Sequence, residues 1–110
     1  MKKLIALSFT LLTAGTVAAH AADAKELWDK NCKKCHGEDG KGKTTMGKKF
    51  GVKDYTSAKV QEELKDNEMV KAIKEGVKKD DQPRMQPFAD KLSSDEIKSL
   101  VAYIRKFKAK

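Results

Sequence analysis

The sequence contains few of the features by which a small protein stabilises itself with side chains alone. Only 6% of its 110 residues are aromatic, and it has two cysteines and two prolines. A chain of this length supports one small domain and excludes a second hydrophobic core. With so few large side chains and crosslinks, we expect something other than amino acids to fill part of the core.

Long apolar runs are absent after residue 21. Before that point, the basic start Met1-Lys2-Lys3 precedes an apolar segment, residues 4–17, and Ala19-His20-Ala21 has the small residues of a cleavage site. This order is typical of a secretory signal peptide. An uncleaved anchor would need about 20 apolar residues, and the run has about 14. We therefore expect residues 1–21 to be removed on export to the periplasm, leaving one soluble domain of residues 22–110 without stable membrane insertion.

Acidic residues are outnumbered, because 16 Asp and Glu stand against 24 Lys and Arg, for a net charge of +8. Residues 1–21 hold two of the lysines and no acid, so the remaining 89 residues carry +6. Such a charge favours encounters with an acidic partner. The alternative is that the lysines only solvate exposed helix faces. Nucleic acid is not an expected partner, because the basic residues are not interleaved with aromatic ones.

The apolar residues recur at helical spacing, and no segment alternates in the way that predicts a strand. The expected helices are one from residue 24 to about residue 34 that carries both cysteines, a short one within 54–65, residues 66–75, and roughly residues 94–107. The glycine-rich segment 37–51 and the segment 78–90, which contains both prolines, are expected to be loops. The sequence therefore predicts a small all-α domain of helices joined by long loops.

Capping residues mark the ends of two of these helices. Asp66 is the expected N-cap of the helix that ends before Gly76. Ser93 and Glu96 form the Ser-x-x-Glu pattern of a capping box, which predicts the start of the last helix.

The strongest chemical signal is Cys32-Lys33-Lys34-Cys35-His36. Cys-x-x-Cys-His is the attachment pattern for haem in c-type cytochromes. Two thiols three residues apart lie on one face of a helix and can each bond one vinyl group of the porphyrin. The next residue then presents its imidazole to the iron. We expect Cys32 and Cys35 to hold the haem and His36 to ligate its iron.

Three other interpretations of this motif are weaker. A structural zinc site needs four ligands, whereas residues 22–110 contain two cysteines and one histidine. A thioredoxin-like redox pair would accompany a βαβ pattern, which the sequence lacks. A plain disulfide would close a loop too small to restrict much of the unfolded chain.

Without a second histidine, the sixth iron ligand is methionine, lysine, water or nothing. Met85 lies between the two prolines, away from any helical stripe, where a methionine has no packing role. Met69 falls on the apolar stripe of the helix 66–75, and Met46 comes only ten residues after His36. We expect Met85 to be the ligand, with Met46 and Met69 as alternatives.

With these residues, the chain resembles the small monohaem class I cytochromes c of bacteria over residues 22–110. The likeness rests on Trp28 before the haem motif, on Met85-Gln-Pro-Phe88, and on the segment 92–104. It implies a class I cytochrome c-like fold of roughly three to five helices around one covalently bound haem c.

The resemblance also implies particular contacts. Trp28 is expected to pack on Leu100 and Tyr103, and Phe88 and Leu92 are expected to close the pocket beside Met85.

The chain departs from the family pattern at two places. The family often has a proline directly after the methionine ligand, but here Gln86 separates Met85 from Pro87. Many members also have a proline shortly after the haem motif whose carbonyl orients the histidine, but here no proline follows the motif before Pro83. A carbonyl of the glycine-rich segment is then expected to orient His36.

These residues predict a monomeric one-electron carrier that is not an enzyme and exchanges electrons with other redox proteins. With both axial positions filled, substrate cannot readily reach the iron. The alternative function is a haem-based sensor or binder of small ligands, in which the Met85 bond is weak or absent.

Overall fold

The computed structural model describes residues 19–108, so the greater part of the expected signal peptide lies outside the described residues. The elements in chain order are α1 Ala19–Asn31, α2 Lys33–His36, α3 Thr45–Phe50, α4 Ala58–Glu63, α5 Asp66–Glu75, β1 Val77–Lys79, β2 Gln82–Met85 and α6 Ser94–Arg105. Residues 19–108 thus form six helices, more than expected, and one hairpin. None of these helices is long and apolar enough to cross a bilayer.

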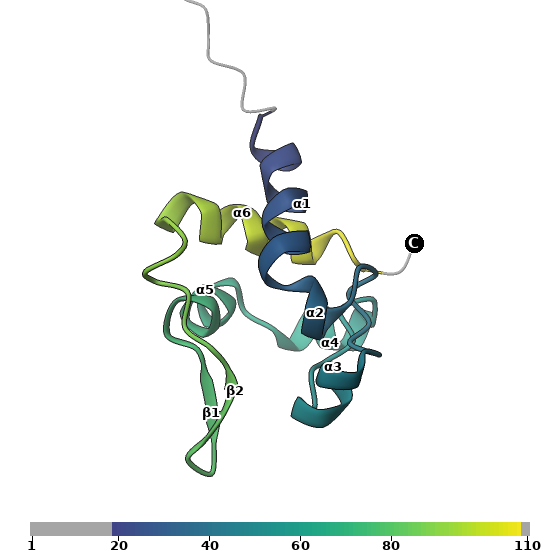
Figure 1. Ribbon diagram of the computed structural model, residues 1–110. Coiled ribbons are helices and arrows are strands. Elements are labelled where there is room, and N and C mark those ends of the chain that lie inside the picture. Colours follow the sequence, from purple (N-terminus) through teal and green to yellow (C-terminus); the bar gives the residue numbers. More distant parts are fainter. Residues whose placement is uncertain (1–18, 109–110) are drawn as a thin grey trace, which may run out of the picture.

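Helices α1 and α6 cross and enclose the hydrophobic core (Figure 1). Trp28 of α1 and Leu100 of α6 are the largest side chains that are fully buried, and they belong to one core cluster. The Trp28 ring lies 5.7 Å from Tyr103 and 4.9 Å from Phe107, measured between ring centroids. Helix α5 packs on α6 as well and adds Ile73 to the core. The expected packing of Trp28 against the last helix is confirmed.

The capping box of α6 forms as predicted. The Ser93 hydroxyl accepts a hydrogen bond from the Glu96 backbone N–H at 3.1 Å, and the Glu96 carboxylate accepts one from the Ser93 N–H at 2.9 Å. Helix α5 ends at Gly76, whose φ is 77°. Its start differs from the prediction, because Asp66 is the first helical residue and Lys65 is the N-cap, without a side-chain bond.

The expected single helix over residues 24–34 is divided at Cys32. This residue has φ −117° and ψ −34° and lies between α1 and α2. Backbone hydrogen bonds continue across the break, from Cys32 to Trp28 at 2.8 Å and from His36 to Cys32 at 3.0 Å. Cys35 and His36 therefore belong to α2, whereas Cys32 lies at the junction.

Part of the glycine-rich segment is helical rather than a loop. Helix α3 begins after Thr44, whose hydroxyl accepts a hydrogen bond from the Gly47 N–H at 2.8 Å. It ends at Gly51, whose φ of 66° is left-handed. An N-cap threonine followed by a glycine stop defines this helix locally, and the abundance of glycine obscured it. The short helix expected within 54–65 is confirmed as α4.

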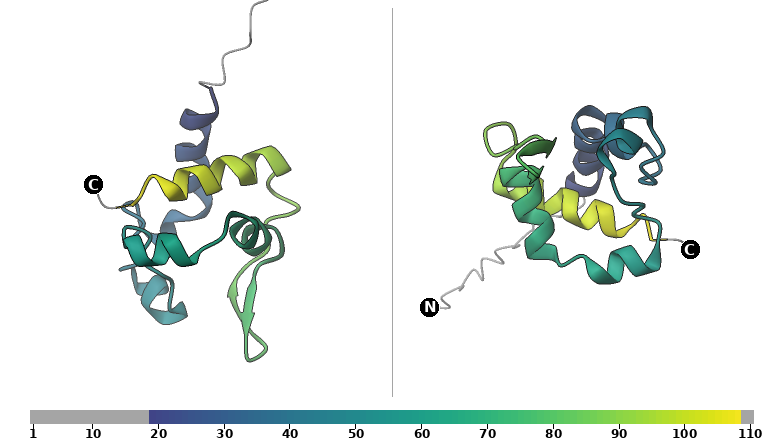
Figure 2. Two further views of the ribbon diagram at one scale, coloured as in Figure 1. Left: turned by 180° about the vertical axis from the view of Figure 1, so that it is seen from behind. Right: turned by 90° about the horizontal axis from the view of Figure 1, so that it is seen from below.

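The segment 78–90 contains a β-hairpin, so the prediction of a domain without strands is wrong. Strands β1 and β2 pair antiparallel. Asp80 and Asp81 have φ values of 53° and 62°, the conformation of a two-residue turn that suits the twist of a hairpin. The strands are largely exposed and show no apolar alternation, which is why the sequence pattern missed them. The hairpin extends away from the helices (Figures 1 and 2).

A polar network joins the end of α6 to the α4–α5 connection. The Gln61 amide donates to the carbonyls of Tyr55 and Ile104 at 2.7 and 2.9 Å. One Nη of Arg105 donates to the Gln61 side chain at 3.0 Å, and the other donates to the Leu64 carbonyl at 2.5 Å and to Asp66 at 2.7 Å. These bonds link segments that lie about forty residues apart, so this region is held by long-range polar contacts as well as by the core.

Candidate functional site

A cavity of about 510 Å³ lies between α2, the segment that follows α3, and the hairpin. It falls within the range of about 300–1,000 Å³ that small-molecule and cofactor sites occupy. Its wall includes all four predicted site residues, Cys32, Cys35, His36 and Met85. Residues that the sequence places up to 53 positions apart are thus brought together in one site.

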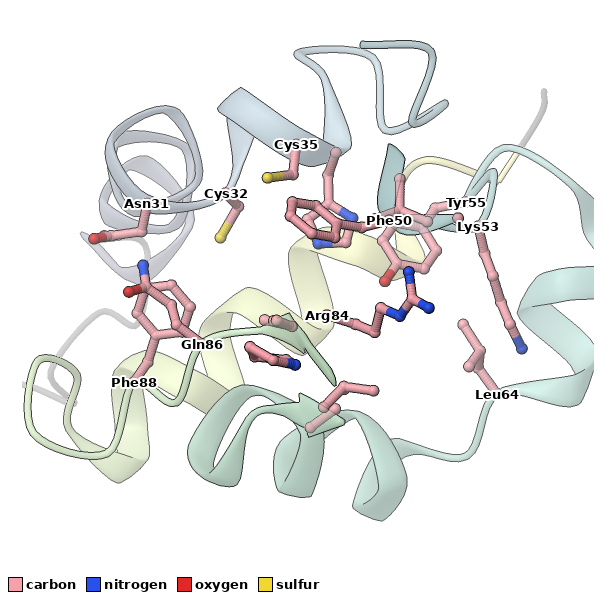
Figure 3. A pocket seen from close by; sticks show the side chains of 17 residues that line it. Asn31, Cys32, Cys35, Phe50, Lys53, Tyr55, Leu64, Arg84, Gln86 and Phe88 are labelled. Carbon is pink, nitrogen blue, oxygen red and sulfur yellow. The ribbon is translucent and has the colours of Figure 1, made fainter. Parts of the chain in front are cut away.

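Both cysteine thiols are free, and their sulfur atoms face the cavity (Figure 3). The disulfide alternative is therefore not what the structure shows. Burial, and to a lesser degree the neighbouring Cys35, raises the pKa of Cys32 to about 12. Within residues 19–108 there is no group of three His, Cys, Asp or Glu side chains that could hold a metal ion, which is what the zinc alternative would need.

His36 is enclosed by aromatic rings. Its imidazole stacks on Tyr55 at 5.4 Å between ring centroids and lies 5.5 Å from Trp28. Burial lowers the pKa of His36 to about 4, so the ring is neutral at pH 7, the form that ligates metals. The stacking partner, Tyr55, was missed by the sequence analysis, which had no local signal for it. Burial raises the Tyr55 pKa to about 12.

Among residues 19–108, no carbonyl accepts a hydrogen bond from His36 as expected. The Nδ1 atom of His36 is buried and has no hydrogen-bond partner. The nearby carbonyls of His36 and Gly37 accept bonds instead from the Gly42 N–H and the Trp28 indole, at 2.8 and 2.9 Å. An unpartnered buried nitrogen costs free energy, and among residues 19–108 no hydrogen bond offsets that cost.

The backbone around the motif is fixed by α3. The Thr44 hydroxyl donates to the Cys35 carbonyl at 2.6 Å while it caps α3. Gly47 lies so close that a Cβ there would come within 2.5 Å of the Cys35 carbonyl oxygen. This contact requires glycine and holds α2 and α3 together. Neither residue had been given a role from the sequence, although threonine is a preferred N-cap residue.

The three methionines considered as iron ligands differ in position. Met85 lines the large cavity with His36, and both also line a smaller adjoining cavity of about 90 Å³. Met69 lines only the smaller cavity and is buried in the core cluster. Met46 lines neither of the two. The geometry therefore favours Met85 over the two alternatives.

Phe88 lines the cavity as expected, but Leu92 does not. Leu92 is buried in the core cluster, beside the start of α6. The expectation that both residues close the pocket is thus correct for Phe88 only.

The cavity suits a covalently attached porphyrin. Two thiols and a neutral imidazole lie on one side of it, a thioether lies on the hairpin, and most of the remaining wall is apolar. Its polar residues include Lys53, Tyr55 and Arg84.

Comparison with known proteins agrees with this geometry. Residues 19–104 match the family model described as "Cytochrome C oxidase, cbb3-type, subunit III". A solved structure titled "KustC0563 c-type cytochrome" has 35% sequence identity and a TM-score of 0.69, covering 77% of this chain and 96% of its own. A tyrosine-to-phenylalanine mutant of that protein gives 36% identity and a TM-score of 0.68, covering 78% of this chain and 99% of its own. No curated protein matches the chain.

Proposed function

The chain belongs to the c-type cytochromes, in the family described as cytochrome c oxidase, cbb3-type, subunit III, and we propose that it carries single electrons through one haem. The observation that carries this proposal is the convergence of Cys32, Cys35, His36 and Met85 on one cavity. Membership of the family implies covalently bound haem c. The ligand set, the class I arrangement around a single haem, and the location in the cell are parts of the proposal.

In this function the thiols of Cys32 and Cys35 would hold the porphyrin through thioether bonds to its two vinyl groups. His36 and Met85 would ligate the iron. The bound group supplies a one-electron change at the iron, and thioether ligation tends to raise its reduction potential. The protein's own contribution is to bury the macrocycle and to keep the ligands in place.

Several contacts support a rigid site. The Trp28 indole holds the Gly37 carbonyl next to the motif, and Thr44 holds the Cys35 carbonyl. Tyr55 stacks on His36 and limits the rotation of the ring. A site that is rigid in this way reorganises little when an electron arrives or leaves. Ligation by both His36 and Met85 would also keep substrates and water away from the iron.

We propose further that residues 1–21 direct export and that the protein acts as a periplasmic monomer with redox proteins as partners. The net charge of +6 over residues 22–110 suits an acidic partner. Many of the lysines near the motif are exposed, among them Lys33, Lys34, Lys41 and Lys43.

Replacing Met85 tests the ligand set. The visible spectrum of Met85→Ala should lose the methionine-to-iron charge-transfer band, and its reduced form should bind carbon monoxide rapidly. Met46→Ala is the matched control, because Met46 lines neither cavity, and it should keep the band.

Three outcomes would contradict the proposal. Survival of the band in Met85→Ala would make the ligand assignment wrong. Rapid carbon monoxide binding by the unmodified protein at neutral pH would favour a ligand-binding function. Absence of covalently attached haem from the exported protein would refute both the ligand assignment and the electron-carrying function.

A further inference from the structure

Strand β2 contains a β-bulge at Arg84. Met85 faces Val77 and Pro83 faces Lys78, so Arg84 between them has no partner on β1. In a regular strand, neighbouring side chains point to opposite faces. A bulge redirects a side chain, and here four consecutive residues, 83–86, all line the large cavity, Arg84 and Met85 among them.

The guanidinium of Arg84 has no hydrogen-bond or ion-pair partner among residues 19–108. Its Nε atom is buried without a hydrogen bond, and none of the ion pairs among residues 19–108 involves it. The wall of the cavity contains no Asp or Glu, whereas Lys53 adds a second cation. Figure 3 shows Arg84, Lys53 and Tyr55 at one end of the cavity and Cys32 at the other. A half-buried cation whose Nε atom is enclosed without a hydrogen bond is unfavourable, so an anionic group on the occupant would suit this end of the cavity.

The hairpin has few other attachments. Its strands are mostly exposed, and Arg84 and Met85 are the only half-buried residues of β1 and β2. The chain is fixed again just after the hairpin, where the Phe88 N–H donates to the Ile73 carbonyl at 2.9 Å. The strand that carries Met85 therefore depends on what Arg84 binds.

We propose that Arg84 latches the hairpin to the haem by binding a carboxylate of the porphyrin side chains, and so holds Met85 at the iron. The proposal rests on the proposed function, since it needs both the haem and the Met85 ligand. Guanidinium matches carboxylate in shape and charge, and hydrogen bonds between such ions are stronger than neutral ones. Arg84 is a positioning residue in this scheme, because it acts on the iron through Met85.

The test compares Arg84→Gln with Lys79→Gln in the haem-loaded protein. Lys79 is exposed on the same hairpin and does not line the cavity, so both variants lose one charge but only one loses the latch. In Arg84→Gln, carbon monoxide should bind the reduced protein roughly tenfold faster, as the loss of a charge-assisted hydrogen bond implies. The methionine-to-iron band should also disappear at a lower temperature. Arg84→Lys should restore part of both properties, and Lys79→Gln should resemble the unmodified protein.

A second measurement does not depend on Met85. The resonance Raman band of the propionate bending vibration should shift in Arg84→Gln and stay in place in Lys79→Gln. Equal behaviour of the two variants in all three measurements would overturn the latch. If Met85→Ala nevertheless loses the charge-transfer band, the proposed ligand set stands and only the role of Arg84 is wrong.

Discussion

Gln61→Leu should destabilise the protein far more than its small change in volume suggests. Gln61 is buried, with 7% of its surface exposed, and its amide donates to two carbonyls from different parts of the chain. Leucine fills a similar volume but donates nothing. The stability lost in this variant therefore comes from the hydrogen-bond partners of Gln61, which are left without it.

The three partners lose different amounts. The Tyr55 carbonyl accepts no other hydrogen bond among residues 19–108, so it would be left unsatisfied. The Ile104 carbonyl keeps a bond from the Phe107 N–H at 3.1 Å. Arg105 keeps the backbone carbonyl of Gln61 at 2.5 Å. One orphaned acceptor costs about 1–3 kcal/mol and each weakened bond less, for a total of about 2–4 kcal/mol.

Urea and thermal unfolding of the haem-loaded protein measure this cost. For a domain of this size, the loss corresponds to a fall in Tm of roughly 10–30 °C. The matched control is Gln82→Leu, the same substitution at an exposed position of β2, which should change Tm little. The free energy of unfolding lost in Gln61→Leu and in Arg105→Leu, added together, should exceed the loss measured for the double variant, because both residues serve one network. A Gln61→Leu protein as stable as the Gln82→Leu control would refute the reasoning.

Two further predictions concern the surroundings of the site. Gly47→Ala should lower the urea midpoint by an amount equivalent to about 1–3 kcal/mol, since the new Cβ would collide with the Cys35 carbonyl, and an unchanged midpoint would show that α2 and α3 are free to separate. The hydrogen bond from the Thr56 hydroxyl, followed by the Thr56 backbone N–H, holds the pKa of Asp54 below its ordinary 3.8. The stability that Asp54 contributes should therefore be present above pH 3.8 and disappear as the pH falls through the lowered pKa, so the unfolding curves of the protein and Asp54→Asn should converge in acid and not at neutral pH.

The site could be predicted from the sequence where its residues are contiguous. Cys32, Cys35 and His36 stand together, and helical geometry fixes their relation before the chain folds. Met85 was selected because no helical stripe accounted for it, and the structure places it in the same cavity. Tyr55 and Arg84 were missed, because nothing near them in the sequence indicates a cavity.

The fold was predictable to a similar extent. The capping box and apolar stripe of α6 are local patterns, and they gave its start to within a residue. The hairpin was missed because its strands are exposed and carry no apolar alternation. The break at Cys32 was missed because good helix formers surround it, so propensity alone favours continuation.

The sequence by itself determined the chemistry of this protein, a motif for covalent haem on a small helical domain with too few large side chains to fill its own core. Those properties depend on the spacing and composition of neighbouring residues. Only the tertiary structure decided how the cavity is built: the ring that stacks on His36, the network around Gln61, and the bulge that turns Arg84 inward. Each of these joins segments far apart in the chain, and their meeting depends on how the helices pack rather than on any local pattern.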